Sequence, residues 1–265
     1  MEIRHIRVRG INLRVGIRPG KGLPFLLFNG IGGSIELLSA FIKASDRYII
    51  IFDAPGAGQS ETAKRPYRHR HFARLSARLL DELGIEKVDV LGISWGGMAA
   101  QQFARQYADR CRRLVLCATS TGQVMVPGKL EALKNMLSPR RYLDPDFLRS
   151  IVGTLYGGTL RNDPDAAMEY AVNMQAPSLK GYYHQLFALT GWTSIHWLHR
   201  LKQPTLVIAG KDDPITPQLN AHLLTYLIPN ASLLLMDCGH LFLLTKAKQL
   251  MPHIDYFLDH DFSDS

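Results

Sequence analysis

Short apolar runs recur along the chain, and segments with helical spacing of apolar residues separate them. Residues 3–9 and 11–18 alternate apolar and polar positions around Gly10, which predicts an antiparallel hairpin at the edge of a sheet. The later runs are continuously apolar, as in strands that are covered on both faces. These runs occupy residues 24–28, 48–52, 88–91, 113–118, 204–210 and 232–236.

The segments between these runs predict helices that connect parallel strands. Over residues 68–83 the apolar positions share one face of a helix, and Gly84 ends it. Residues 98–107 and 247–258 also favour helices. Strands that alternate with helices in this way predict an α/β fold, in which a mostly parallel sheet is flanked by helices on both faces.

The alternation of strands and helices breaks between residues 122 and 199. This segment has no convincing strand, and it carries more large apolar side chains than a purely exposed insertion does. We therefore expect a helical cap over residues 122–199, inserted into a core formed by residues 1–121 and 200–265. The large side chains pack on the core, line a pocket, or both: Tyr182, Tyr183, Phe187, Trp192 and Trp197.

Composition is typical of a globular protein from a reducing compartment. Apolar residues make up 46% of the 265 residues and charged residues 20%, which excludes disordered and fibrous classes. No apolar run approaches the length of a transmembrane helix, and the first residues lack the apolar stretch of a secretory signal. The cysteines at 111, 117 and 238 fit neither a disulfide framework nor a metal site. We expect a cytoplasmic protein with free thiols.

The net charge of +8 does not by itself identify a partner. Basic proteins attract nucleic acids, anionic lipids or acidic surfaces, but no nucleic-acid motif accompanies this charge, so we expect no nucleic-acid partner. Arg70, Arg74 and Arg78 form a row of like charges on the helix predicted over residues 68–83. Such a row is usually exposed to solvent, and the alternative is contact with an anionic surface.

Candidate chemistry centres on Ser94, in the sequence Gly92-Ile93-Ser94-Trp95-Gly96 between a predicted strand and a predicted helix. A sharp strand-to-helix turn presents the serine hydroxyl and needs neighbours with almost no side chain, a need that the two glycines meet. Because the turn opens a helix, the Trp95 N–H points to where a carbonyl oxygen becomes negative during attack by Ser94. Ser94 is the candidate nucleophile, and Trp95 is a candidate oxyanion donor.

A serine nucleophile needs a base, and ten histidines are available. Only His240 directly follows a predicted strand downstream of the serine, at the carboxyl edge where sites of open α/β sheets form. Asp212 or Asp213, after the preceding strand, supplies the acid that orients the imidazole. Five histidines lie on helical or terminal stretches, where we expect exposure to solvent: His69, His71, His222, His253 and His260.

A second glycine-rich loop, Asn29-Gly30-Ile31-Gly32-Gly33, follows the strand over residues 24–28. The Ile31 N–H is the simplest second oxyanion donor, because the flanking glycines let the backbone turn toward Ser94. Asn29 is expected to brace this loop. The candidate contacts to substrate are Asn29 together with the cap residues Tyr183, Phe187, Trp192 and Trp197.

At this point the chain resembles the α/β-hydrolase superfamily, and more closely the intracellular medium-chain-length polyhydroxyalkanoate depolymerases. The resemblance covers most of the sequence. Its specific motifs lie in the predicted cap: Met125-Val126-Pro127-Gly128-Lys129, Ser138-Pro139-Arg140-Arg141-Tyr142, Gly181-Tyr182-Tyr183 and residues 191–199. The chain departs from the family pattern at His184, where an aromatic residue is expected, and at Lys211, where an acid is expected.

This resemblance implies a serine esterase that cleaves storage polyesters of aliphatic 3-hydroxyacids through an acyl-enzyme, with Ser94, His240 and Asp213 as the triad. Asp213 is favoured because the acid of the superfamily usually lies three residues after a glycine, here Gly210. No metal and no organic cofactor are implied. The implied partners are the polyester or another aliphatic ester and the surface of storage granules in the cytoplasm.

Other functions are compatible with the same residues. A general carboxylesterase, a carbon–carbon bond hydrolase or a cofactor-free haloperoxidase of this fold keeps the triad and differs mainly in its cap. A granule-coat protein or a ligand-sensing protein keeps the fold without catalysis. Reaction of Ser94 with a fluorophosphonate separates the enzymes from the last two classes.

Overall fold

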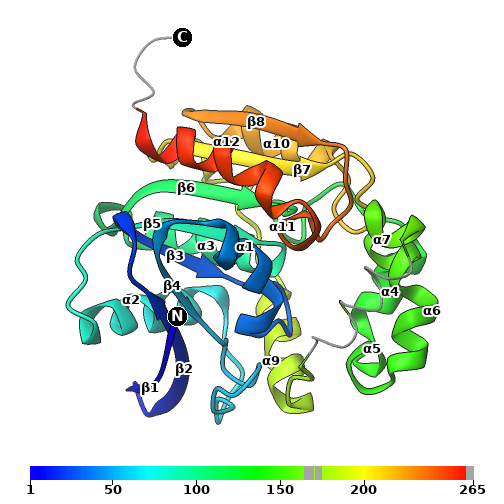
Figure 1. The fold of residues 1–265 in the computed structure, drawn as a ribbon, viewed down its shortest axis with the longest axis horizontal. Helices are drawn as coiled ribbons and strands as arrows, with labels where there is room; N and C mark the ends of the chain where they lie inside the picture. The colour runs from blue at the N-terminus through cyan, green and yellow to red at the C-terminus, as the bar shows by residue number, and fades with distance from the viewer. Residues whose placement is uncertain (164–169, 171–174, 261–265) are drawn as a thin grey trace.

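The computed structural model describes residues 1–163, 170 and 175–260, and it is built around one sheet of eight strands (Figure 1). The strands lie in the order β1-β2-β4-β3-β5-β6-β7-β8. The pairs β1–β2 and β2–β4 are antiparallel, and all pairs from β4–β3 to β7–β8 are parallel. Their bounds are Glu2–Val8 (β1), Ile11–Arg18 (β2), Lys21–Phe28 (β3), Arg47–Phe52 (β4), Val88–Ile93 (β5), Cys111–Cys117 (β6), Thr205–Gly210 (β7) and Ala231–Met236 (β8). The predicted α/β fold and its edge hairpin are confirmed.

Helices cover both faces of the sheet because successive residues of a buried strand point to opposite faces. Leu26 and Phe28 of β3 pack in one core cluster with α2 and α3, while Phe25 and Leu27 pack in the other with α1 and α12. The helices outside the cap are α1 (Ser39–Ala44), α2 (His69–Glu82), α3 (Trp95–Gln106), α10 (Leu219–Leu227), α11 (Phe242–Thr245) and α12 (Ala247–Asp259). Three short 3₁₀ helices are η1 (Ile35–Leu38), η2 (Ala108–Arg110) and η3 (Leu198–Arg200).

The segment between β6 and β7 is helical wherever it forms regular structure in the described residues, apart from one isolated bridge between Gly122 and Thr193. Its helices are α4 (Leu130–Leu137), α5 (Arg140–Leu143), α6 (Pro145–Tyr156), α7 (Thr159–Asn162) and α9 (Leu179–Leu189). We keep the name cap for residues 122–199. Figure 1 shows α4 to α7 standing together beside the sheet, with α9 apart from them.

The cap packs in two different ways. Residues from α4, α6 and α7 form a small apolar cluster of their own, which Ile215 and Leu241 join from loops after β7 and β8. In contrast, Tyr182 and Ala188 of α9 belong to the main core cluster. Part of the cap is therefore fixed to the core through α9, while the rest rests on the loops at the carboxyl edge of the sheet. Within the described ranges, no helix is long and apolar enough to cross a membrane.

Candidate active site

Ser94 occupies a strained turn between β5 and α3. Its backbone has φ 54° and ψ −117°, in a region that residues with a side chain rarely adopt. Two hydrogen bonds hold the turn. The Ser94 N–H donates to the Cys117 carbonyl at 2.9 Å, and the Ser94 carbonyl accepts from the Thr119 hydroxyl at 2.7 Å. Both partners come from the end of β6 and the residues after it, so the neighbouring strand fixes the serine at the edge of the sheet.

The two glycines around Ser94 are required by close backbone contacts. A Cβ on Gly92 would lie 2.2 Å from the Gly96 carbonyl oxygen, and a Cβ on Gly96 would lie 2.2 Å from the Phe28 carbonyl oxygen. Neither contact is sterically allowed, and both neighbours are backbone atoms that cannot move aside as a flexible side chain can. The glycines therefore let α3 begin directly against β3 and β5.

His240 and Asp213 are joined by a buried hydrogen bond of 2.7 Å between Nδ1 and Oδ2. Asp213 also accepts bonds from the Ile215 and Thr216 N–H groups, each at 2.9 Å, and from the Thr216 hydroxyl at 2.7 Å. An acceptor on this side places the imidazole proton on Nδ1 and leaves Nε2 as the basic nitrogen. This is the arrangement that a general base for a serine requires.

Asp212, the alternative acid, is turned toward the cap. It accepts the Gly158 N–H at 2.8 Å and forms an ion pair with Arg161 at 2.9 Å. Of the two adjacent aspartates, the structure brings only Asp213 to His240.

Ser94 and His240 line the same small cavity, which has a volume of about 30 Å³. In the described part of the chain no hydrogen bond joins the two side chains directly, which is common in a site without bound substrate. The cavity is roofed by the cap and floored by loops of the core. Its lining residues are Asn29, Gly30, Ile31, Leu37, Ile93, Ser94, Met136, Arg141, Tyr142, Tyr156, Tyr170, His240 and Leu241.

The backbone N–H groups around this cavity that have no partner among the described residues include those of Ile31 and Trp95. In the Ile31 loop, Gly30 N–H donates to the Asn29 side chain at 2.9 Å and Gly33 N–H to the Gly30 carbonyl at 3.0 Å. The Trp95 N–H is the first of α3 and has no carbonyl before it to bond. These two groups are available for a negatively charged oxygen, as an oxyanion hole requires.

Gln185 of α9 connects the two segments that carry these N–H groups. Its side-chain oxygen accepts the Gly32 N–H at 2.8 Å, and its backbone carbonyl accepts the indole N–H of Trp95 at 2.9 Å. Tyr142 of α5 adds a bond from its hydroxyl to the Ile31 carbonyl at 2.5 Å. The cap thus holds in place the two segments that carry the candidate oxyanion donors, contacts that sequence reasoning missed.

With this geometry in place, comparisons with known proteins assign the family. Residues 24–247 match the model of the family described as alpha/beta hydrolase fold. The chain belongs to this family. It is 50% identical over 262 residues to a poly(3-hydroxyalkanoate) depolymerase of Ectopseudomonas oleovorans, an alignment that covers 97% of this chain and 93% of the relative. The predicted resemblance to polyhydroxyalkanoate depolymerases and the expectation of a hydrolytic enzyme are confirmed.

Two further proteins are less similar to this chain. A 2-hydroxymuconate semialdehyde hydrolase of Pseudomonas putida is 29% identical over 259 residues, covering 90% of this chain and 88% of the relative. Among solved structures, the enol-lactonase of Burkholderia xenovorans LB400 superposes with a TM-score of 0.84 at 21% identity, covering 97% of this chain and all of that one. That superposition supports the fold.

The five predicted substrate contacts are scattered over this α/β-hydrolase. Asn29 lines the cavity, but its side chain is engaged in the loop, where its amide donates to the Ser34 carbonyl at 2.6 Å. Tyr183 and Phe187 are 54% and 40% exposed on α9. Trp192 and Trp197 pack against each other, and Trp192 donates to Gln102 at 2.9 Å. The structure thus brings one of the five to Ser94.

Four large polar residues of the cap line the cavity instead, and sequence reasoning gave them no role. They are Arg141, Tyr142, Tyr156 and Tyr170. The first two belong to the motif over residues 138–142, which is part of the resemblance to the depolymerases. That motif was the one sequence feature that could have pointed to these residues. From the residue types alone, however, a segment that lines a cavity cannot be distinguished from an exposed turn.

The expectation that His69 is exposed to solvent is wrong. Its side chain is fully buried, with ring centroids 4.7 Å from Trp95 and 4.9 Å from Trp192. Neither ring nitrogen has a partner among the described residues. Burial lowers the pKa of His69 to about 3, so the imidazole is neutral. The first turn of α2 is enclosed because His69 contacts Trp95 next to the Ser94 turn and also contacts Trp192 of the cap.

The predicted arginine row is exposed, and its members differ in their surroundings. Arg78 pairs with Asp81 at 3.2 Å. Arg70 and Arg74 line a shallow hollow together with Arg68 and Arg105. The lining of this hollow includes no acidic residue. Contact with an anionic surface stays a prediction.

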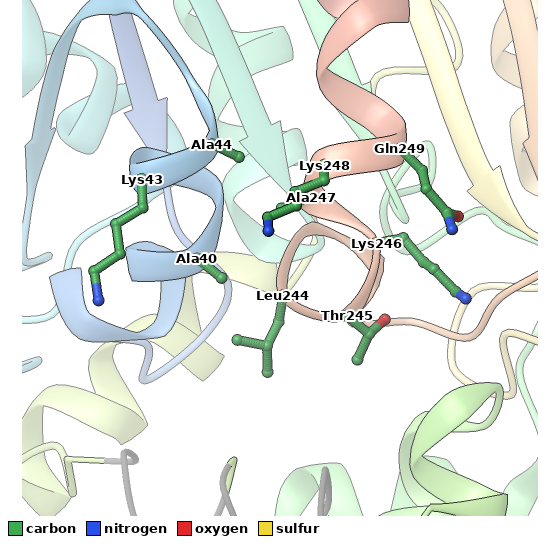
Figure 2. A pocket seen from close by; sticks show the side chains of 9 residues that line it. All are labelled: Ala40, Lys43, Ala44, Leu244, Thr245, Lys246, Ala247, Lys248 and Gln249. Carbon is green, nitrogen blue, oxygen red and sulfur yellow. The ribbon is translucent and has the colours of Figure 1, made fainter.

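A further hollow lies between α1 and the segment that joins α11 to α12 (Figure 2). Figure 2 shows Lys43 on one side of it and Lys246 and Lys248 on the other. Its lining holds no histidine, carboxylate, cysteine or serine, so it offers no nucleophile or acid–base pair. Across the described ranges, no cluster of His, Cys, Asp or Glu has the geometry of a metal site.

Proposed function

We propose that this α/β-hydrolase is a serine esterase that hydrolyses poly(3-hydroxyalkanoate), the aliphatic polyester named by its 50% identical relative. One observation carries the proposal: Ser94 and His240, which is bonded to Asp213, line a single cavity together with residues of the cap that holds the motifs specific to the resemblance. A carboxylate bonded to Nδ1 of a histidine holds the imidazole in the orientation in which Nε2 can act as the general base for a serine nucleophile.

The proposed reaction has two steps. Ser94 Oγ attacks the ester carbonyl while His240 Nε2 accepts its proton, and the Ile31 and Trp95 N–H groups stabilise the negative oxygen of the tetrahedral intermediate. His240 then donates the proton to the departing alcohol, leaving the acyl group on Ser94. In the second step His240 takes a proton from water and the hydroxide attacks the acyl-enzyme. His240 then returns the proton to Ser94 Oγ as the bond to the acyl group breaks and the free acid leaves.

The exposed surface of the cap supports contact with an insoluble polyester. Seven of the twelve exposed large apolar side chains among the described residues lie in the cap, more than its share of the chain. They are Val124, Leu130, Leu137, Leu143, Leu179, Tyr183 and Phe187. Concentrated exposed apolar groups are typical of a binding surface. We infer that the cap faces storage granules in the cytoplasm.

The test is hydrolysis of an aliphatic 3-hydroxyalkanoate polymer by the purified protein, compared with a short activated ester. We expect release of 3-hydroxyacids from the polymer, and no release by Ser94→Ala. Activity on the short ester alone contradicts the polyester proposal and favours a general esterase. A protein that also fails to react with a fluorophosphonate at Ser94 is not a serine hydrolase.

The adjacent aspartates give a matched control for the triad. Asp213→Asn removes the acceptor that fixes the His240 tautomer, and we expect kcat to fall about 10⁴-fold. Asp212→Asn makes the same chemical change one residue away and breaks the ion pair with Arg161. Since Asp212 does not contact His240, we expect kcat within a few-fold of wild type. Equal losses in both variants contradict the assignment of Asp213.

A further inference from the structure

Arg141 is buried in the cap at the wall of the Ser94 cavity. Only 2% of its surface is exposed. Its guanidinium donates to the Tyr156 hydroxyl at 2.6 Å and to the Tyr182 hydroxyl at 3.3 Å, and it lies over the Tyr142 ring at 4.3 Å from the ring centre. All of these partners are neutral.

The surroundings of Arg141 differ from those of other buried arginines. Arg47, which is 1% exposed, pairs with Asp255 at 2.6 Å and with Asp259 at 2.7 Å. Arg141 has no carboxylate partner among the described residues, and its Nε has no hydrogen-bond acceptor there. A buried charge without a counter-charge is unfavourable, and the planar guanidinium is suited to a carboxylate.

A second donor lies beside it. The Tyr156 hydroxyl accepts from Arg141 and also from the Tyr170 hydroxyl at 2.9 Å, so its own proton is left without an acceptor in the part of the chain that the structure describes. The Tyr156 ring lies parallel to the His240 ring, with centroids 6.3 Å apart. Arg141, Tyr156, His240 and Ser94 all line the same cavity. A guanidinium and an O–H donor therefore converge next to the catalytic groups.

We propose that Arg141, with the Tyr156 hydroxyl, binds the free carboxylate at the end of the polyester, so that the enzyme cleaves the ester bond nearest the carboxyl end. This inference rests on the proposed function. In a 3-hydroxyacid polyester, two carbons separate the last ester oxygen from the terminal carboxylate. When the carbonyl of that ester is at Ser94, the carboxylate is near enough to reach a side chain that lines the same small cavity.

The proposal determines which product leaves first. The terminal 3-hydroxyacid departs as the alcohol when its ester oxygen takes the proton from His240, and the shortened chain stays on Ser94 until water releases it with a new terminal carboxylate. Ester bonds in the interior of the polymer carry no neighbouring charge, so they leave the Arg141 guanidinium without a partner. Attack from the carboxyl end follows.

The test uses a dimer of an aliphatic 3-hydroxyacid, either as the free acid or as its methyl ester, which removes the charge and keeps the scissile bond. For the wild-type enzyme we expect kcat/KM to be at least about 10-fold higher for the free acid. In Arg141→Gln we expect kcat/KM for the free acid to fall about 100-fold and that for the methyl ester to fall much less, so that the preference disappears. Arg141→Lys keeps the charge and should retain part of the preference.

Other outcomes overturn the proposal in distinguishable ways. If wild type cleaves both dimers equally, or if Arg141→Gln lowers both activities in parallel, Arg141 only supports the cap. If Arg141→Gln does not fold, inhibition of the wild-type enzyme decides instead: the free 3-hydroxyacid should inhibit at concentrations at least about 10-fold lower than its methyl ester, and equal inhibition contradicts the proposal. If neither dimer nor the polymer is cleaved, the proposed function itself has failed.

Discussion

At the scale of one residue, the surroundings of His69 determine the charge of its imidazole. An imidazole normally changes charge near neutral pH, but this one is enclosed by Trp95 and Trp192 without a hydrogen-bond partner among the described residues. Burial disfavours the charged form and lowers its pKa to about 3. It therefore packs as a neutral ring against Trp95, the residue whose N–H is a proposed oxyanion donor.

This burial predicts a loss of stability in acid. Between pH 6.5 and 3 the unfolded chain binds a proton at residue 69 and the folded protein does not, so the free energy of unfolding falls as pH falls. At pH 5 the contribution is about 2 kcal/mol relative to pH 8. Denaturant unfolding measures the free energy of unfolding at both pH values. We expect its drop from pH 8 to pH 5 to be about 2 kcal/mol smaller for His69→Phe than for wild type. An equal drop in both proteins contradicts the prediction.

At the scale of elements, α9 links the cap to the catalytic apparatus. Gln185 bonds the Ile31 loop through its side chain and the Trp95 indole through its backbone. A helix packed in the main core can hold these segments more firmly than a surface loop can. The orientation of both proposed oxyanion donors therefore depends on one turn of a helix that is distant in sequence.

We expect Gln185→Leu to lower kcat about 10-fold with little change in KM, because the Gly32 bond is lost while the Ile31 N–H remains present but less firmly placed. Gln102→Leu is the matched control: it removes a glutamine bond to Trp192 of the cap without contact to the Ile31 loop. Its kcat should be near that of wild type. Steady-state kinetics on a soluble ester test both variants, and a change in KM alone for Gln185→Leu contradicts a positioning role.

At the scale of the whole molecule, the size of the cavity and the surface of the cap bear on how a polymer enters. The cavity of about 30 Å³ is far smaller than the roughly 300–1,000 Å³ of ordinary ligand pockets. If the proposed polyester is the substrate, we expect the cap to shift when a polymer segment enters, and the exposed apolar side chains of the cap are then the expected contact with the polymer.

The exposed cap leucines should promote adsorption. We expect Leu137→Asn combined with Leu143→Asn to reduce binding to polyester particles several-fold, because two side chains that are 61% and 56% exposed lose contact with the polymer. Hydrolysis of a soluble dimer should be unchanged. Leu219→Asn is the control, since Leu219 is 58% exposed and lies outside the cap. Sedimentation with particles measures binding, and equal loss in the control contradicts a role specific to the cap.

Much of the fold was predictable because it depends on local periodicity. Continuous apolar runs became the inner strands, and the helix expected over residues 68–83 is α2, His69–Glu82. Of the candidate site, Ser94 was identifiable because strain at the turn demands glycines at fixed spacing. The choice between Asp212 and Asp213 was not accessible from their spacing, since adjacent residues of one type differ only in the direction that the loop gives each side chain.

The sequence by itself determined the parallel sheet, the helices on its two faces and the turn at Ser94, because these depend on residues that are near one another along the chain. Only the tertiary structure decided that His69 is buried, that Gln185 bonds both the Ile31 loop and Trp95, and that Arg141 lies at the cavity. Those roles depend on contacts between residues far apart in sequence. Such contacts exist only once the cap has packed against the carboxyl edge of the sheet.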